Sequence, residues 1–210
     1  MGNTVQILIP GSEINSFYVY EHIMEGGKPV YSDRNGDGNI TNEDLYVDQN
    51  GDGIVNQNDF IVNESPAPEW LMGLTSLMRW RRFDFSFTLS AQIGNYVYNN
   101  VASNRGFYDN LRDSEAPNNL HRSVLETEFQ SPQYFSDYYV EDASFLRLNN
   151  VQLGYTFRNL FNGLRVYAVA QNLFTITGYS GIDPTAGING IDNNIYPRAQ
   201  TFTAGVEVGF

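Results

Sequence analysis

Alternation of apolar and polar residues is the strongest signal in this sequence. In one stretch the apolar residues are Phe83, Phe85, Phe87, Leu89, Ala91 and Ile93. In the last ten residues they are Phe202, Ala204, Val206, Val208 and Phe210. An amphipathic helix would not place an apolar residue at every second position, whereas a strand with one apolar face does. Residues 83–93 and 201–210 are therefore predicted to be β-strands.

Four further stretches predict strands from related patterns. They cover residues 17–22, 70–80, 144–157 and 164–175. Within 144–157 the apolar phase slips after Leu148, as a β-bulge near Asn149 and Asn150 would produce. The sequence thus predicts six strands.

The connections between these strands alternate in length. They run long over 23–65, short over 81–82, long over 99–143, short over 158–163 and long over 176–200. In an up-and-down antiparallel sheet all the long connections fall at one end, as in the wall of a transmembrane β-barrel. Strands that cross a membrane need ~9–11 residues, whereas strands in soluble proteins usually have ~5–6. The predicted lengths favour the membrane wall.

We therefore expect an all-β fold: part of an antiparallel transmembrane β-barrel wall, with about six strands and long outer loops. An open sheet edge in lipid leaves unsatisfied backbone groups, so this wall should continue beyond the chain. Residues 1–14 are expected to be a lead-in, 15–210 a C-terminal barrel segment, and 33–59 an inserted loop pair. The alternative is a secreted β-sandwich whose apolar faces form a dry core.

Composition removes several classes of function. No stretch of the 210 residues approaches the ~18 apolar residues of a membrane-spanning helix. The chain has no cysteine, which excludes disulfides, thiolate metal sites and cysteine nucleophiles. A net charge of −12 argues against nucleic acid as a partner. About half of this charge lies in 33–59, which has seven acidic residues and one basic residue.

That acidic segment contains a repeat, because the pattern D-x-N-G-D-G beginning at Asp33 recurs at Asp48. In the pattern D-x-[DN]-x-[DN]-G, oxygen ligands at positions 1, 3, 5, 7 and 12 surround one cation, and glycine at position 6 permits a sharp turn. The ligands would be Asp33, Asn35, Asp37, Asn39 and Asp44 in the first loop, and Asp48, Asn50, Asp52, Ile54 and Asp59 in the second.

These hard oxygen ligands suit Ca²⁺, so two calcium sites are predicted. Both loops end in aspartate where the EF-hand has glutamate, which makes a modest affinity the expectation. Only residues 45–47 separate the loops, which leaves no room for the helices of an EF-hand pair. The alternative is a cluster of Asn-Gly and Asp-Gly turns that binds no metal.

No enzymatic constellation is apparent. His22 and His121 are the only histidines, belong to no metalloprotease or triad signature, and are expected to be ordinary surface or loop residues. One long connection is rich in aromatic residues, namely Phe107, Tyr108, Phe129, Tyr134, Phe135, Tyr138 and Tyr139. They could bind sugar or peptide, but we expect them mainly to bury the loop against itself.

Several stretches resemble the C-terminal part of SusC/RagA-type TonB-dependent outer-membrane transporters. The run YYVEDASFLRLNNVQLGY (138–155) and the run QNLFTITGYSGIDP (171–184) are similar to signatures of that family. The stretch from 190 to the end is similar to its closing strand, and the acidic loop that begins at Asp33 also has a counterpart in many members.

The resemblance implies a large barrel in the outer membrane of a Gram-negative bacterium, in contact with outer-membrane lipid and closed by a plug that TonB displaces. It implies a SusD-like surface lipoprotein as partner, glycan or peptide as substrate, and calcium loops that face outward from the cell. The family's contacts with TonB are expected to be made by regions missing from this sequence. The alternative is a soluble secreted calcium-binding β-module that binds carbohydrate.

Overall fold

The computed structural model describes residues 5–112, 118–161, 163–187 and 189–209. They form two compact units. The first, here called the loop unit, contains the described residues up to 67 together with 95–142 and 180–195. The second, here called the wall unit, contains 68–94, 143–179 and the described residues from 196 onward.

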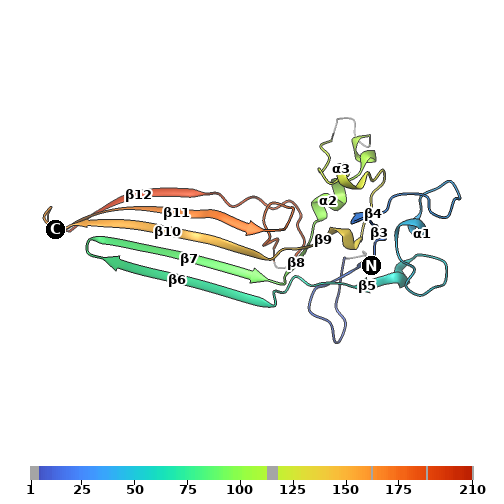
Figure 1. The fold of residues 1–210 in the computed structure, drawn as a ribbon, viewed down its shortest axis with the longest axis horizontal. Helices are drawn as coiled ribbons and strands as arrows, with labels where there is room; N and C mark the ends of the chain where they lie inside the picture. The colour runs from blue at the N-terminus through green and yellow to red at the C-terminus, as the bar shows by residue number, and fades with distance from the viewer. Residues whose placement is uncertain (1–4, 113–117, 162, 188, 210) are drawn as a thin grey trace. The chain divides into compact units, whose positions relative to one another are not determined.

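The wall unit is one antiparallel sheet of five strands (Figure 1). The strands are β6 (Trp70–Trp80), β7 (Phe83–Ile93), β10 (Phe145–Phe157), β11 (Leu164–Thr177) and β12 (Thr201–Val208). They lie in the order β12-β11-β10-β7-β6, so strands that follow one another in the sheet follow one another along the chain. The up-and-down arrangement is confirmed, and with it the fold class. Phe210, the last residue of the predicted closing strand, lies outside the described residues.

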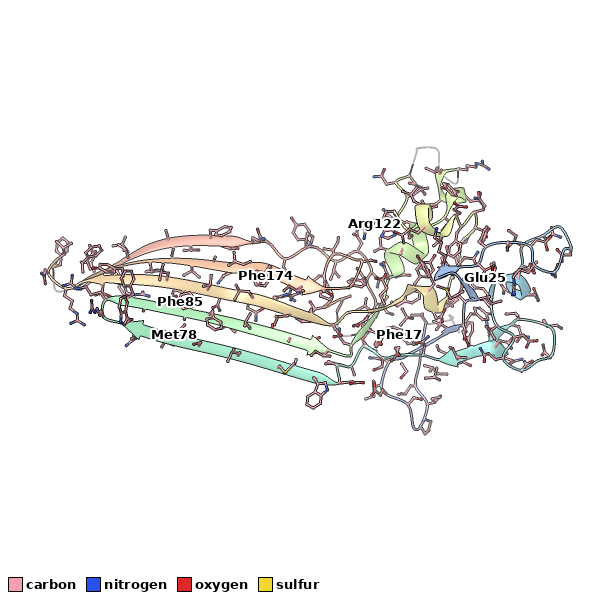
Figure 2. All side chains as sticks on the ribbon, viewed as in Figure 1. Phe17, Glu25, Met78, Phe85, Arg122 and Phe174 are labelled. Carbon is pink, nitrogen blue, oxygen red and sulfur yellow. The ribbon has the colours of Figure 1, made fainter. Side chains whose placement is uncertain are left out.

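The register places apolar residues of all five strands on one face. One row across the sheet consists of Met78, Phe85, Leu153, Ala168 and Ala204. This face is not covered by a second layer of the described chain, since Phe83 is 45% exposed and Val206 is 65% exposed. Figure 2 shows side chains along the strands, with Met78, Phe85 and Phe174 labelled. A self-contained sandwich core is therefore not what these strands form.

The two short connections join β6 to β7 and β10 to β11, and the long ones join β7 to β10 and β11 to β12. Because neighbouring strands are antiparallel, both long connections leave from the same end of the sheet. The pairing of β10 shifts register between Leu148 and Asn150, which confirms the predicted bulge.

The strand predicted at 17–22 forms, but its placement in the wall was wrong. It is observed as β2 (Ser16–Tyr20), which pairs with β1 (Gln6–Ile7) and β5 (Phe60–Val62) in a separate three-stranded sheet of the loop unit. Phe17 and Val19 are fully buried there. Five residues are too few to cross a hydrocarbon layer, and burial inside the loop unit gives them a different environment. The wall unit accordingly has five strands.

The rest of the loop unit consists of short elements around an aromatic core. Its remaining strands are β3 (Met24–Glu25), β4 (Lys28–Pro29), β8 (Tyr96–Tyr98) and β9 (Val140–Asp142). Its helices are α1 (Asn42–Leu45), α2 (Asn100–Arg105) and α3 (Val124–Thr127), with 3₁₀ turns η1 (Gln57–Asp59), η2 (Tyr108–Leu111) and η3 (Asp137–Tyr139). Phe107, Phe129 and Tyr139 are buried in one cluster with Phe17, which supports the self-burying interpretation of the aromatic connection. In the part of the chain that the structure describes, every helix is too short or too polar to cross a membrane.

Candidate functional site

The first acidic loop is held by hydrogen bonds from its own backbone. The carboxylate of Asp33 accepts from the N–H of Gly36 at 2.6 Å and from the N–H of Gly38 at 2.8 Å. The side-chain oxygen of Asn35 accepts from the N–H of Asp37 at 2.8 Å. Gly38 has a φ of +91°, a left-handed conformation that favours glycine at position 6 of the motif. The sequence D-x-N-G-D-G therefore specifies this turn locally.

The second loop repeats the same geometry at the equivalent positions. The carboxylate of Asp48 accepts from the N–H of Gly51 at 2.7 Å and from the N–H of Gly53 at 2.8 Å. Asn50 accepts from the N–H of Asp52 at 2.8 Å. These backbone hydrogen bonds, above all the one from Gly53, lower the pKa of Asp48 below its ordinary value. The sequence repeat is thus a structural repeat.

Position 7 of each loop donates its N–H to the carboxylate at position 5. The N–H of Asn39 lies 2.8 Å from Oδ1 of Asp37, and the N–H of Ile54 lies 2.8 Å from Oδ1 of Asp52. Both pairs are at the exposed tips of the loops.

Each loop is closed by a buried aspartate at position 12. Oδ1 of Asp44 accepts from the N–H groups of Arg34 at 2.9 Å and Asn35 at 3.1 Å. Its Oδ2 accepts from the N–H of Thr41 at 2.9 Å and from the Thr41 hydroxyl at 3.2 Å. These bonds, with the Thr41 N–H first among them, lower the pKa of Asp44. Asp44 thereby joins the start of the loop to the first turn of α1.

Asp59 has the same role in the second loop. Its Oδ1 accepts from the N–H groups of Gln49 at 3.0 Å and Asn50 at 3.4 Å, and its Oδ2 from the N–H of Asn56 at 2.8 Å. Like Asp44, Asp59 is fully buried. Both residues therefore organise the loops through backbone contacts.

The donor chemistry of the loops fits Ca²⁺, but the side chains are directed to the backbone. Across the described residues, no three acidic or histidine side chains gather closely enough to hold a metal ion. A carboxylate oxygen has two lone pairs, so Asp33 and Asp48 keep acceptor capacity, whereas each oxygen of Asp44 already accepts two hydrogen bonds. The residues predicted as ligands are thus held in order within each loop by hydrogen bonds to its backbone.

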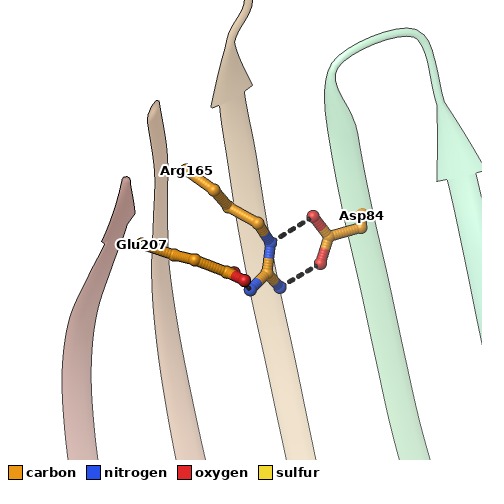
Figure 3. Close-up of polar contacts among 3 residues, drawn as sticks. All are labelled: Asp84, Arg165 and Glu207. Atoms are coloured by element: carbon orange, nitrogen blue, oxygen red, sulfur yellow. Dashed lines mark hydrogen bonds and ion pairs between the residues drawn. The ribbon is translucent and has the colours of Figure 1, made fainter. Parts of the chain in front are cut away.

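The polar face of the wall unit carries an ionic bridge that sequence reasoning missed (Figure 3). Nε of Arg165 lies 3.0 Å from Oδ1 of Asp84, and its Nη2 lies 2.6 Å from Oδ2. Nη1 of the same guanidinium lies 3.4 Å from Oε2 of Glu207. The bridge reaches from β11 over β10 to β7, and to β12 on the other side. Residues so far apart in sequence could be linked only once the strand register was known.

A glycine in the intervening strand makes room for this bridge. A Cβ atom on Gly154 of β10 would lie 2.5 Å from Oδ1 of Asp84 and 2.8 Å from Nη2 of Arg165. The ion pair therefore lies in the space that a side chain at 154 would fill.

His22 was expected to be an ordinary surface or loop residue and is instead buried, with 3% of its area exposed. Its Nε2 lies 2.8 Å from the carbonyl oxygen of Val30, and its Nδ1 lies 3.0 Å from the Ser136 hydroxyl. Burial lowers the pKa of the imidazole, and the hydrogen bond to Val30 partly opposes this. His22 is buried for the same reason that β2 is not in the wall. The strand β2 ends just before His22 and lies in the core of the loop unit. His121 is half-buried in a loop, with Nδ1 2.9 Å from the Ser123 hydroxyl, as expected of a loop histidine.

Comparison with known proteins gives a consistent result. No family model matches the chain. The TonB-dependent receptor SusC of Bacteroides thetaiotaomicron is 40% identical over 214 residues, which cover 95% of this chain and 20% of that receptor. The TonB-dependent receptor P3 of Formosa agariphila is 29% identical over 245 residues, covering 98% of this chain and 23% of that receptor. The resemblance to SusC/RagA-type transporters is confirmed.

Solved structures show a similar fold. The RagAB peptide importer in its closed-closed state matches with a TM-score of 0.62 and 25% identity, covering 98% of this chain and 25% of that chain. Its open-open state matches with a TM-score of 0.63. The relatives are named as a TonB-dependent receptor and as a peptide importer. The chain spans about a fifth of the length of the curated relatives.

Proposed function

We propose that this chain forms part of the barrel wall of a TonB-dependent nutrient importer in the outer membrane of a Gram-negative bacterium. The observation that carries the proposal is the wall unit, which has four strands of 11–14 residues and one of eight, with an exposed apolar face. Such a face is stable against lipid and unfavourable against water. The similarity to SusC supports the same conclusion.

We infer further that the importer takes up glycan or peptide together with a SusD-like surface lipoprotein. The solved relative RagAB is named a peptide importer, which supports peptide as the substrate of that relative. TonB would act through regions outside this sequence.

The long connections of the wall would then face the outside of the cell, as longer extracellular loops do in outer-membrane barrels. The acidic double loop belongs to the loop unit that these connections build, which is why we place it outside as well.

The loops would bind Ca²⁺ through Asp33, Asn35 and Asp37 in the first copy and through Asp48, Asn50 and Asp52 in the second. The support is the repeated hard-oxygen donor set with left-handed glycines at position 6. Bound Ca²⁺ would neutralise part of the net charge of −6 in 33–59.

Uptake of labelled oligosaccharide and labelled peptide by cells with and without the full-length protein tests transport. We expect one of the two labels to accumulate in a TonB-dependent way. Equal uptake by both strains, together with protein that is monodisperse without detergent, would contradict the proposal and favour a soluble module.

Calorimetric titration of the full-length protein tests the metal separately. We expect heat on addition of Ca²⁺, and binding roughly tenfold weaker after D33N or D48N, because ligand charge sets affinity in such loops. Asn118→Ala, which lies outside both loops, is the control. If millimolar Ca²⁺ produces neither heat nor thermal stabilisation, the calcium proposal is wrong and the loops are a cluster of turns that binds no metal.

A further inference from the structure

The polar face of the wall unit contains a hollow of about 490 Å³ next to the two short connections. Five arginines are among the residues that line it, namely Arg79, Arg81, Arg82, Arg158 and Arg165. These are five of the 12 basic residues in a chain whose net charge is −12. Positive charge is therefore concentrated in this hollow, although the whole chain is negatively charged.

The two carboxylates of the hollow do not neutralise this charge. Asp84 and Glu207 both contact Arg165, in the bridge described above. Among the described residues, Arg82 and Arg158 form no ion pair, and Arg81 lies over the ring of Trp80 at 5.2 Å. Five guanidinium groups and two carboxylates leave an excess of positive charge in the hollow.

The floor of the hollow is formed by an arginine with several partners. Arg165 is bound in bidentate fashion to Asp84, and its guanidinium also lies 4.9 Å from the ring centre of Tyr167. The missing side chain of Gly154 leaves room for the ion pair. A ligand would therefore meet a preorganised floor and compete for the arginines that carry no ion pair.

The hollow lies on the polar face of the sheet. In β6, Arg79 alternates with the apolar residues Met78 and Trp80, and in β7, Asp84 alternates with Phe83 and Phe85. If the apolar face contacts lipid, as proposed above, the hollow faces the aqueous interior of the barrel.

We propose that this hollow is an anion-binding site in which Arg79, Arg82 and Arg158 hold carboxylate or phosphate oxygens above the Asp84–Arg165–Glu207 bridge. Guanidinium groups pair with both kinds of oxyanion through charge-assisted hydrogen bonds. The occupant is a small anionic solute in the barrel interior, since a lipid headgroup would lie on the opposite face.

Calorimetry on the detergent-solubilised full-length protein tests the site, with inorganic pyrophosphate as the phosphate probe and citrate as the carboxylate probe. We expect at least one to bind at low ionic strength, with affinity that falls as salt is added. R82A and R158A should each weaken binding about tenfold. Arg105→Ala, a basic residue of α2 in the loop unit, should leave it unchanged.

Comparing the affinity for pyrophosphate with the affinity for citrate identifies the oxyanion that the site prefers. Failure of both probes to bind at millimolar concentration would overturn the proposal, as would equal weakening by R105A. Binding only to vesicles that contain phosphatidylglycerol would also overturn it, because it would place the arginines at a lipid surface. Unchanged detergent-resistant folding of each variant, measured by gel mobility before and after heating, separates these outcomes from misfolding. Transport could fail while the anion site survives, so the two proposals are tested independently.

Discussion

The two units of this chain use the same kinds of side chain in opposite ways. In the loop unit, Phe17 and Phe129 are fully buried among other aromatic residues. In the wall unit, Phe202 and Trp80 keep 71% and 66% of their area exposed. Aromatic content alone therefore says little about a core. The neighbours that the backbone brings to each side chain decide whether it packs inward or faces another phase.

The largest test of this contrast truncates one aromatic residue in each unit. We expect F129A to cost about 3–5 kcal/mol of stability, because it opens a cavity in a packed core. F202A removes a ring that has few protein contacts and should change the unfolding free energy of detergent-solubilised protein much less. Chemical denaturation of both variants measures the difference. Equal losses would contradict the assignment of the two environments.

A charge placed on each face of one strand sharpens the comparison further. Phe87 and Ser86 are neighbours in β7 and point to opposite faces. F87K should impair membrane assembly by about 2–4 kcal/mol, because Phe87 lies near the middle of the strand. S86K faces the polar side and should assemble normally. Heat-modifiable mobility on gels provides the readout, and equal assembly of the two variants would argue against lipid on the apolar face.

A smaller effect is expected from pH, and only in the loop unit. The lowered pKa of His22 means that protonation favours the unfolded chain, so stability is full above the ordinary histidine pKa of about 6.5 and falls as pH decreases below it. Burial raises the pKa of neighbouring Asp137, whose protonation acts in the opposite direction. Subtracting the unfolding free energy of H22Q from that of the wild type at each pH removes the contribution of Asp137. A difference that does not change between pH 7 and pH 5 would contradict this role of His22.

The wall was predictable because a strand with one apolar face leaves a direct record in the sequence. The ranges called for β6, β7, β10, β11 and β12 agree closely with the structure, and the slip near Asn149 marked a real bulge. Alternation of apolar and polar residues cannot distinguish a lipid-facing strand from a short buried strand. For this reason β2 was assigned to the wall. Its length of five residues was the signal that could have corrected this.

The candidate sites divide in a similar way. The acidic loops are local, so sequence spacing placed every turn residue correctly, although it could not tell that Asp44 and Asp59 would be occupied by backbone N–H groups. The Asp84–Arg165 pair joins residues 81 positions apart. Only the register of three strands brings them together, and no local pattern contains that information.

The single-layered sheet has a consequence for the order in which this protein matures. The loop unit has buried hydrophobic clusters of its own. In the proposed barrel, the wall unit gains most of its stabilisation only when its apolar face leaves water and its edge strands, β6 and β12, pair with other strands. On that proposal, insertion into the bilayer completes folding, and any delay before it leaves the five strands of the sheet open to aggregation.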